Sequence, residues 1–430
     1  MNTPLFDAIC RYADNGMRFH MPGHKGEKLN PLYYSAPFDV TELDFSDNLL
    51  SAHGVIAASE RLAAEAYGAD ETLMFTNGTT GALFAMLYAA KQYSERIVIP
   101  KNAHKSVWNA LTVLNTLPYP VEVGYDEDGL PERIDPDRIA RAVSESGAKA
   151  VLVTSPDYFG MCENIEEIRR RLPGDVLLLA DAAHGAHFAF SKLLPEGAER
   201  FADMTVTSAH KTLPVYTGGA YLHTRAKFAE AAKRGRELFH TTSPSYTVMC
   251  SMDYARGLYS ERGEAIYGRL YNAVENLSRR TEVRKTDDFS RVLLRAESGK
   301  RLYDYLKGKG IYCECFTKRH VVLIATPGDE EKLDALSLEG FRDGEDKIPV
   351  CRNFESERVI DYIAAQQAET EEVELDRAKG RISARNVGLY PPGAPIVTAG
   401  ELITEEEAEF FARYEDYVFG ISDGRVCVVK

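Results

Sequence analysis

Between about residues 70 and 225, short apolar runs alternate with stretches that have the composition of helices. The apolar runs are rich in β-branched residues and read, in order, RIVIP, KAVLVTS, VLLLAD, MTVTS and GGAYLHT. The stretches between them include GALFAMLYAAKQY and NIEEIRRRL. Strands that are apolar on both faces and alternate with helices are typical of a mostly parallel sheet covered by helices on both sides. The sequence therefore predicts an α/β fold built on such a sheet.

The pattern changes after about residue 260, where RLYDYLKGKGIYCECF, RHVVLIAT and the acidic segment AETEEVELD follow one another. A chain of 430 residues is long enough for two or three domains. We predict an N-terminal segment (residues 1–45), a large domain (46–260) and a smaller α+β C-terminal domain (261–430).

Charge and composition exclude several classes of partner. The formal net charge of −14 argues against a nucleic acid or an anionic membrane as the main partner. No run approaches the roughly 18 apolar residues of a membrane helix. The first residues carry Asp7 and Asp14 where a signal peptide would be basic and then apolar, so we expect a cytoplasmic protein. The seven cysteines form no C-x-x-C pair, and we expect no metal site.

Polar or small residues follow five of the predicted strands at their C-terminal ends. The five clusters are residues 76–80, 101–104, 156–158, 181–184 and 209–211. In an open parallel sheet, the carboxyl ends of the strands form the ligand crevice. We therefore expect the clusters to converge on one site, into which Lys211 would point.

Two of the clusters suggest the chemistry of that site. In FTNGTTGALFAML, Gly78 frees the backbone, and Thr79 and Thr80 stand at a helix start, where unpaired N–H groups favour an anion. An ordinary helix cap is the alternative interpretation. Ser208 and His210 flank Lys211 and would add donors to a phosphate.

Asp181 follows a run of apolar residues, so it should be buried and in need of a cationic or hydrogen-bonded partner. The protonated nitrogen of a pyridine ring would serve. His104 is either a buried core histidine or a residue that stacks on a flat ring. A lysine, a phosphate cradle and a buried aspartate together suggest pyridoxal 5'-phosphate (PLP) as the cofactor.

Eight motifs carry a family resemblance. They are FHMPGHKG, TNGTTG, PKNAHKSV, TSPDYFG, ADAAHGAHF, TSAHKTLP, HTTSPSY and LYPPGAP. In these motifs the chain resembles the Orn/Lys/Arg decarboxylase family of fold-type I PLP enzymes, and most of all its compact bacterial members without an N-terminal wing domain. The resemblance implies a seven-stranded, mostly parallel sheet with a smaller C-terminal domain.

The resemblance also implies roles for individual residues. Lys211 would form the Schiff base, Asp181 would pair with the pyridine nitrogen, and Ala183 and His104 would pack on opposite faces of the ring. His184 would sit near the ring hydroxyl or near Asp181. The phosphate group would be held by Thr79, Thr80, Ser208 and His210, and Gly78 would belong to the same cofactor-binding turn.

A homodimer is implied as well, because Thr242 in HTTSPSY would reach the phosphate of the partner subunit. His20, His24 and Lys25 of FHMPGHKG would line the site, without assigned roles.

Two positions depart from the family's pattern. Arg385 stands in RISARNVGLYPPG where an acidic residue is usual, and Asp157 stands in TSPDYFG where threonine is common. Arg385 either turns away into an ion pair with Glu372 or Glu374, or faces the site, in which case the substrate is acidic, neutral or bound by its carboxylate. We expect the first arrangement.

The resemblance implies PLP-dependent decarboxylation of a small-molecule substrate (lysine, arginine or ornithine) to the corresponding amine. Two alternatives stay open. Transamination on the same scaffold would use an arginine to grip the substrate α-carboxylate, and Arg385 is a candidate for that role. A catalytically silent PLP-binding relative is disfavoured by the intact Lys211, Asp181 and His104.

Overall fold

The computed structural model describes residues 1–15, 34–390 and 393–430. Its centre is a seven-stranded sheet in the order β1-β7-β6-β5-β4-β2-β3. β7 is antiparallel to both of its neighbours, and the remaining pairs are parallel, as the sequence predicts. The strands are β1 (Glu71–Phe75), β2 (Arg96–Pro100), β3 (Leu117–Val121), β4 (Ala150–Thr154), β5 (Leu177–Ala182), β6 (Met204–Thr207) and β7 (Ala220–Thr224).

Helices cover both faces of this sheet. In β4, Leu152 joins the core formed with α3, α4 and α8, whereas Val151 and Val153 join the core formed with α5 and α6. Because side chains alternate along a strand, a strand buried on both faces must be apolar throughout. The helices are α2 (Val55–Tyr67), α3 (Gly78–Lys91), α4 (Lys105–Leu114), α5 (Pro136–Ser146), α6 (Ile165–Arg171), α7 (Ala209–Thr212) and α8 (Ala229–Phe239).

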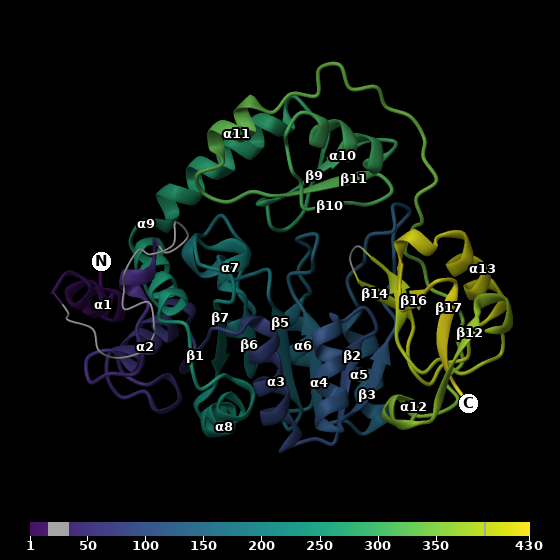
Figure 1. The fold of residues 1–430 in the computed structure, drawn as a ribbon, viewed down its shortest axis with the longest axis horizontal. Helices are drawn as coiled ribbons and strands as arrows, with labels where there is room; N and C mark the ends of the chain where they lie inside the picture. The colour runs from purple at the N-terminus through teal and green to yellow at the C-terminus, as the bar shows by residue number, and fades with distance from the viewer. Residues whose placement is uncertain (16–33, 391–392) are drawn as a thin grey trace.

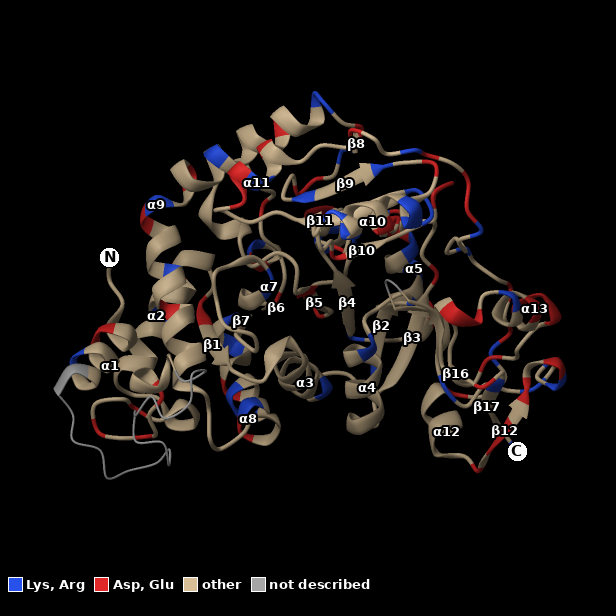
Figure 2. Ribbon diagram, turned by 45° about the horizontal axis from the view of Figure 1, so that its top comes forward, with Lys and Arg blue, Asp and Glu red and all other residues tan. Residues whose placement is uncertain are grey.

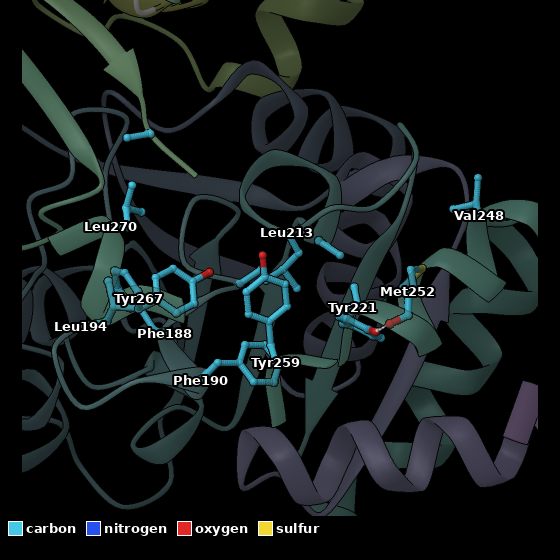
Figure 3. Close-up of a cluster of buried hydrophobic side chains, with 14 of the residues drawn as sticks. Phe188, Phe190, Leu194, Leu213, Tyr221, Val248, Met252, Tyr259, Tyr267 and Leu270 are labelled. Carbon is cyan, nitrogen blue, oxygen red and sulfur yellow. Dashed lines mark hydrogen bonds between the residues drawn. The ribbon is translucent and has the colours of Figure 1, made fainter. Parts of the chain in front are cut away.

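A long helix, α9 (Tyr246–Ser278), connects the large sheet with the C-terminal part (Figure 1). Its inner face packs into a core that also includes the N-terminal helix α1 (Pro4–Asn15). Figure 3 shows part of this core, in which the Tyr221 hydroxyl donates to the carbonyl oxygen of Met252 at 3.3 Å. The expected boundary between residues 260 and 261 therefore falls inside one continuous helix, and the division into domains stays a prediction.

The C-terminal part contains three small sheets, which give it the predicted α+β character. A four-stranded antiparallel sheet in the order β10-β11-β9-β8 lies above the large sheet in Figure 1. Its elements are β8 (Val283–Arg284), β9 (Arg291–Arg295), α10 (Gly299–Gly308), β10 (Cys315–Phe316), β11 (His320–Ile324) and α11 (Glu330–Ala335).

The two three-stranded sheets lie beside the β3 edge of the large sheet (Figure 1). One has the order β12-β17-β16 and the other the order β14-β13-β15. Their elements are α12 (Tyr362–Gln367), β12 (Thr370–Glu374), β13 (Val387–Leu389), β14 (Ala394–Val397), α13 (Glu405–Arg413), β15 (Val418–Phe419), β16 (Ile421–Ser422) and β17 (Arg425–Val429).

Acidic and basic side chains are interspersed over the described chain (Figure 2). The first turn of α13 carries three consecutive acids, Glu405, Glu406 and Glu407. Within the described ranges, no helix has the length and apolar character needed to cross a bilayer.

Candidate active site

A cavity of about 470 Å³ opens at the carboxyl ends of the strands of the large sheet. Ten of the eleven residues predicted for the site line it, so the strand-end clusters converge as expected. These ten are Gly78, Thr79, Thr80, His104, Asp181, Ala183, His184, Ser208, His210 and Lys211.

Thr242, the eleventh predicted residue, and Lys101, from one of the strand-end clusters, do not line this cavity. Thr242 is exposed, in the segment that joins α8 to α9. Lys101 is 5 % exposed, and its Nζ forms ion pairs with Glu122 at 2.9 Å and Glu401 at 3.4 Å. Lys101 therefore links β2 to the C-terminal part.

Lys211 lies in the short helix α7, directly after β6, and is half-buried. Its Nζ is 3.1 Å from Nε2 of His184. Burial lowers the pKa of the Lys211 amine, and the nearby charge of Asp181 opposes that shift. The lysine is thus placed where its neutral, nucleophilic form is favoured more than on an open surface.

Asp181 lies near the end of β5 and is 3 % exposed. Its Oδ1 accepts the backbone N–H of Ala183 at 3.1 Å. Burial raises the pKa of Asp181, while the charges of Lys211 and His104 lower it. A buried carboxylate with one hydrogen bond can accept a further cationic or N–H partner from a molecule in the cavity.

The N-terminus of α3 forms a site for an anion. Gly78 has φ +77°, a conformation that favours glycine, and Asn77 provides no side-chain cap. The hydroxyl of Thr79 is buried and has no hydrogen-bond partner among the described residues. The N–H of Gly78 donates to the carbonyl oxygen of Gly218 at 2.8 Å. The N–H groups of Thr79 and Thr80, which follow in the first turn, and the Thr79 hydroxyl fit a phosphate group.

His104 caps the N-terminus of α4 and faces the cavity. Its Nδ1 accepts the backbone N–H of Ser106 at 3.3 Å and lies 2.7 Å from the Ser106 hydroxyl. Burial lowers the pKa of His104, and Asp181 opposes that shift. The ring is therefore held in place through Nδ1. The donors, the carboxylate and the lysine together fit PLP.

Carboxylates line another part of the same cavity, namely Glu132, Asp157 and Glu163. Burial raises the pKa of Asp157 to about 6 and that of Glu163 to about 7. Arg133 also lines the cavity, but its Nη2 is bound to both carboxylate oxygens of Asp287 at 2.7 Å. Glu163 is a cavity residue that the sequence did not single out.

Arg385 does not line this cavity. Its Nη1 donates to Oε1 of Gln366 at 2.7 Å, beside a separate groove on α4. Glu374, one of the two expected partners, is paired with Arg425 instead. The side chain turns away from the cavity as expected, but the partner is an amide that α12 supplies. The motif FHMPGHKG, with His20, His24 and Lys25, lies outside the described residues.

The fold is shared with solved lysine decarboxylases that have a low sequence identity to this chain. The structure superposes on the *Francisella novicida* lysine decarboxylase LdcF with a TM-score of 0.80 at 17% identity, covering 100% of this chain and 81% of that one. The constitutive lysine decarboxylase of *Escherichia coli* gives a TM-score of 0.77 at 20% identity, with 100% and 82% covered.

The chain belongs to the Orn/Lys/Arg decarboxylase family. The family model of the major domain matches residues 3–294, and that of the C-terminal domain matches residues 357–417. The chain is 28% identical to an arginine decarboxylase of *Bacillus subtilis* (strain 168), with 96% of this chain and 94% of the relative covered. It is 29% identical, with the same coverage, to the uncharacterized protein YaaO of that organism. The enzyme is thus an amino acid decarboxylase, which confirms the predicted family and class.

Proposed function

We propose that the protein decarboxylates a basic amino acid (lysine, arginine or ornithine) to the corresponding amine, with PLP bound at Lys211. The observation that carries this proposal is the single cavity in which Lys211, Asp181, His104 and the N-terminus of α3 meet. PLP, when bound, supplies an electron sink for the pair left behind as CO₂ departs.

The protein's own residues would hold the cofactor and tune it. Lys211 would bind its aldehyde carbon, and the first turn of α3 with Thr79 would hold its phosphate. Asp181 would hold a proton on the ring nitrogen, because a buried carboxylate stabilises an adjacent cation. His104, fixed through Nδ1, would cover one face of the ring.

The charge of the cavity supports a basic substrate. Glu132, Asp157 and Glu163 face it, whereas the guanidinium of Arg133 is already neutralised by Asp287. A substrate with a distal ammonium or guanidinium group would find a carboxylate partner there. Relatives named arginine decarboxylase, which align over almost their whole length, support the same class.

The lining also disfavours transamination. Among the described residues, Arg133 is the arginine that lines the cavity, and it is held by Asp287. A decarboxylase gains from leaving the substrate α-carboxylate without an ion pair, because such a pair stabilises the ground state that must be lost.

A homodimer in the cytoplasm is part of the proposal. Thr242 is exposed, in a segment anchored to the strand end that leads into α3. There, Nε2 of His240 accepts the backbone N–H of Thr76 at 2.9 Å, and Nδ2 of Asn77 donates to the carbonyl of Phe239 at 2.8 Å. An exposed threonine in an anchored segment can reach a second subunit.

The experiment is to incubate the purified protein and PLP with lysine, ornithine and arginine, and to measure CO₂ and the amine. Lys211→Ala is the control. We expect one of the three substrates to give CO₂ and amine in equal amounts, with none from the control. Formation of a keto acid without CO₂ would refute decarboxylation, and no turnover of any amino acid would favour a silent relative.

A further inference from the structure

A buried arginine contacts His184, one of the residues that line the cavity. Arg291 begins β9 of the four-stranded sheet, is 1 % exposed and does not line the cavity. Its Nη2 lies 2.9 Å from Nδ1 of His184. Its Nε and Nη1 have no hydrogen-bond partner among the described residues. A buried guanidinium is costly, so its position calls for an explanation.

The contact with Arg291 determines where His184 carries its proton. A guanidinium can only donate hydrogen bonds, so Nδ1 of His184 must be the acceptor and must be unprotonated. A neutral imidazole then carries its proton on Nε2. That atom is 3.1 Å from Nζ of Lys211.

The proton on Nε2 in turn determines the state of Lys211. If Nε2–H donates to Nζ, the lysine nitrogen must offer a lone pair, which only the neutral amine has. A lysine ammonium in this position would face an N–H group. Protonating Nδ1 instead would turn an N–H group toward the guanidinium of Arg291.

The charged groups around His184 act in the same direction as burial. Burial, followed by the charges of Lys211, Arg291, His104 and His187, places the pKa of His184 well below its ordinary value. Neutral His184 is therefore favoured at pH 7.

The pKa values of Lys211 and Arg291 are each shifted by effects that oppose one another. For Lys211, burial and Arg291 lower the pKa of the amine, whereas Asp181 and Glu314 raise it. For Arg291, burial lowers the pKa of the guanidinium, and acidic groups around it raise it; these are Asp288, Glu314, Tyr158 and Asp157.

We propose that Arg291 is a positioning residue for Lys211: by donating to Nδ1 it fixes His184 in the Nε2–H form, which holds Lys211 as the neutral amine. Condensation with an aldehyde forms the bond from Nζ to carbon and releases the carbonyl oxygen as water, and only the neutral amine can attack. This inference rests on the proposed role of Lys211, but its tests need no decarboxylation.

The first test is the protonation pattern of His184 in the full chain, freed of bound aldehyde with hydroxylamine. Long-range proton–nitrogen NMR of protein with ¹⁵N-labelled histidine distinguishes the two ring nitrogens, and His184→Gln identifies the signal. We expect a proton on Nε2 and none on Nδ1 at pH 7. A proton on Nδ1 would overturn the proposal, and this test needs no variant of Arg291.

The second test is the reactivity of Lys211 toward formaldehyde and cyanoborohydride, read by peptide mass against the exposed Lys347 as an internal reference. Arg291→Met removes the donor, and Arg291→Lys retains one. We expect the ratio of labelling at Lys211 to that at Lys347 to fall about tenfold at pH 7 in the methionine variant, equivalent to one pKa unit.

The lysine variant should stay closer to the parent, because an ammonium can also donate to Nδ1. An unchanged ratio in Arg291→Met, or an equal fall in both variants, would assign Arg291 to packing alone and overturn the proposal. A chain that labels as expected but releases no CO₂ would refute the proposed function and leave this inference intact.

Discussion

Replacing Gly160 with alanine tests whether Arg291 is held as tightly as the structure indicates. Gly160 has φ +88°, and a Cβ built there would lie 2.7 Å from both Cβ and Cγ of Arg291. The left-handed conformation costs alanine about 1–2 kcal/mol, and overpacking a filled core costs about 1–3 kcal/mol. We therefore expect Gly160→Ala to lower the free energy of unfolding by about 2–5 kcal/mol.

Two other glycines separate these contributions. Gly68 has φ +68° and no atom within 4 Å of a built Cβ, so Gly68→Ala reports the backbone cost alone. Gly174 has open space and no positive φ, so its substitution should be close to neutral. Urea unfolding, followed by circular dichroism and by the fluorescence of the single tryptophan, Trp108, gives the three values. If Gly160→Ala and Gly68→Ala unfold at the same urea concentration, the argument from close contact with Arg291 is refuted.

Three further predictions concern buried charges. Asp181→Asn should lower kcat at least about 100-fold on the best substrate, because it would remove the charge that we propose stabilises the pyridine nitrogen of PLP. A near-normal kcat would leave Asp181 a structural role. Arg236→Met should cost about 3–5 kcal/mol in urea unfolding, because Nη1 of Arg236 donates to Oε1 of the buried Glu60 at 2.5 Å; a loss under about 1 kcal/mol would contradict this. Burial raises the pKa of Glu199 from 4.5 to about 7, so the folded state holds its proton more tightly than the unfolded state. Glu199→Gln should therefore stabilise the fold at pH 8 by on the order of 3 kcal/mol and lose this advantage by pH 5, whereas equal effects at both pH values would refute the shift.

The large sheet could be predicted from the sequence because its inner strands are buried on both faces. RIVIP corresponds to β2 without error, and VLLLAD differs from β5 by one residue at each end. β3 was not predicted, because its sequence, LPYPV, contains Pro118 and Pro120. The strand lies at the edge of the sheet, where the missing N–H groups need no partner. Whether such a segment forms a strand depends on its position in the folded sheet rather than on the preferences of its own residues.

The C-terminal part was harder to predict for a different reason. Its strands are two to five residues long, too short for a period of two to stand out. The helix α9 also continues through the position where the composition changes. The change in composition therefore does not mark the end of a structural element. The partner of Arg385 could not be predicted from the sequence either. It is Gln366, whose position is set by the packing of α12 and not by the charge of nearby segments.

The strand-end residues that line the cavity could be predicted because parallel strands bring their ends to one edge, but Arg291 could not be predicted. It lies 107 positions from His184 in the sequence, and RVLLR looks like a strand with an exposed basic end. The motif TSPDYFG nevertheless contains residues that the structure connects to Arg291. Asp157 closes that turn by accepting the backbone N–H groups of Phe159 and Met161 through Oδ1.

The turn that Asp157 closes sets the position of Gly160, and Gly160 connects it to the buried arginine. The Gly160 carbonyl accepts the backbone N–H of Asp288 at 3.0 Å, and the absent Cβ leaves room for the side chain of Arg291. Asp157, where the sequence departs from the family's pattern, therefore lies at the start of a chain of contacts. That chain leads through Arg291 and His184 to the amine of Lys211, so we expect a substitution in the turn to alter the reactivity of Lys211 without contacting it.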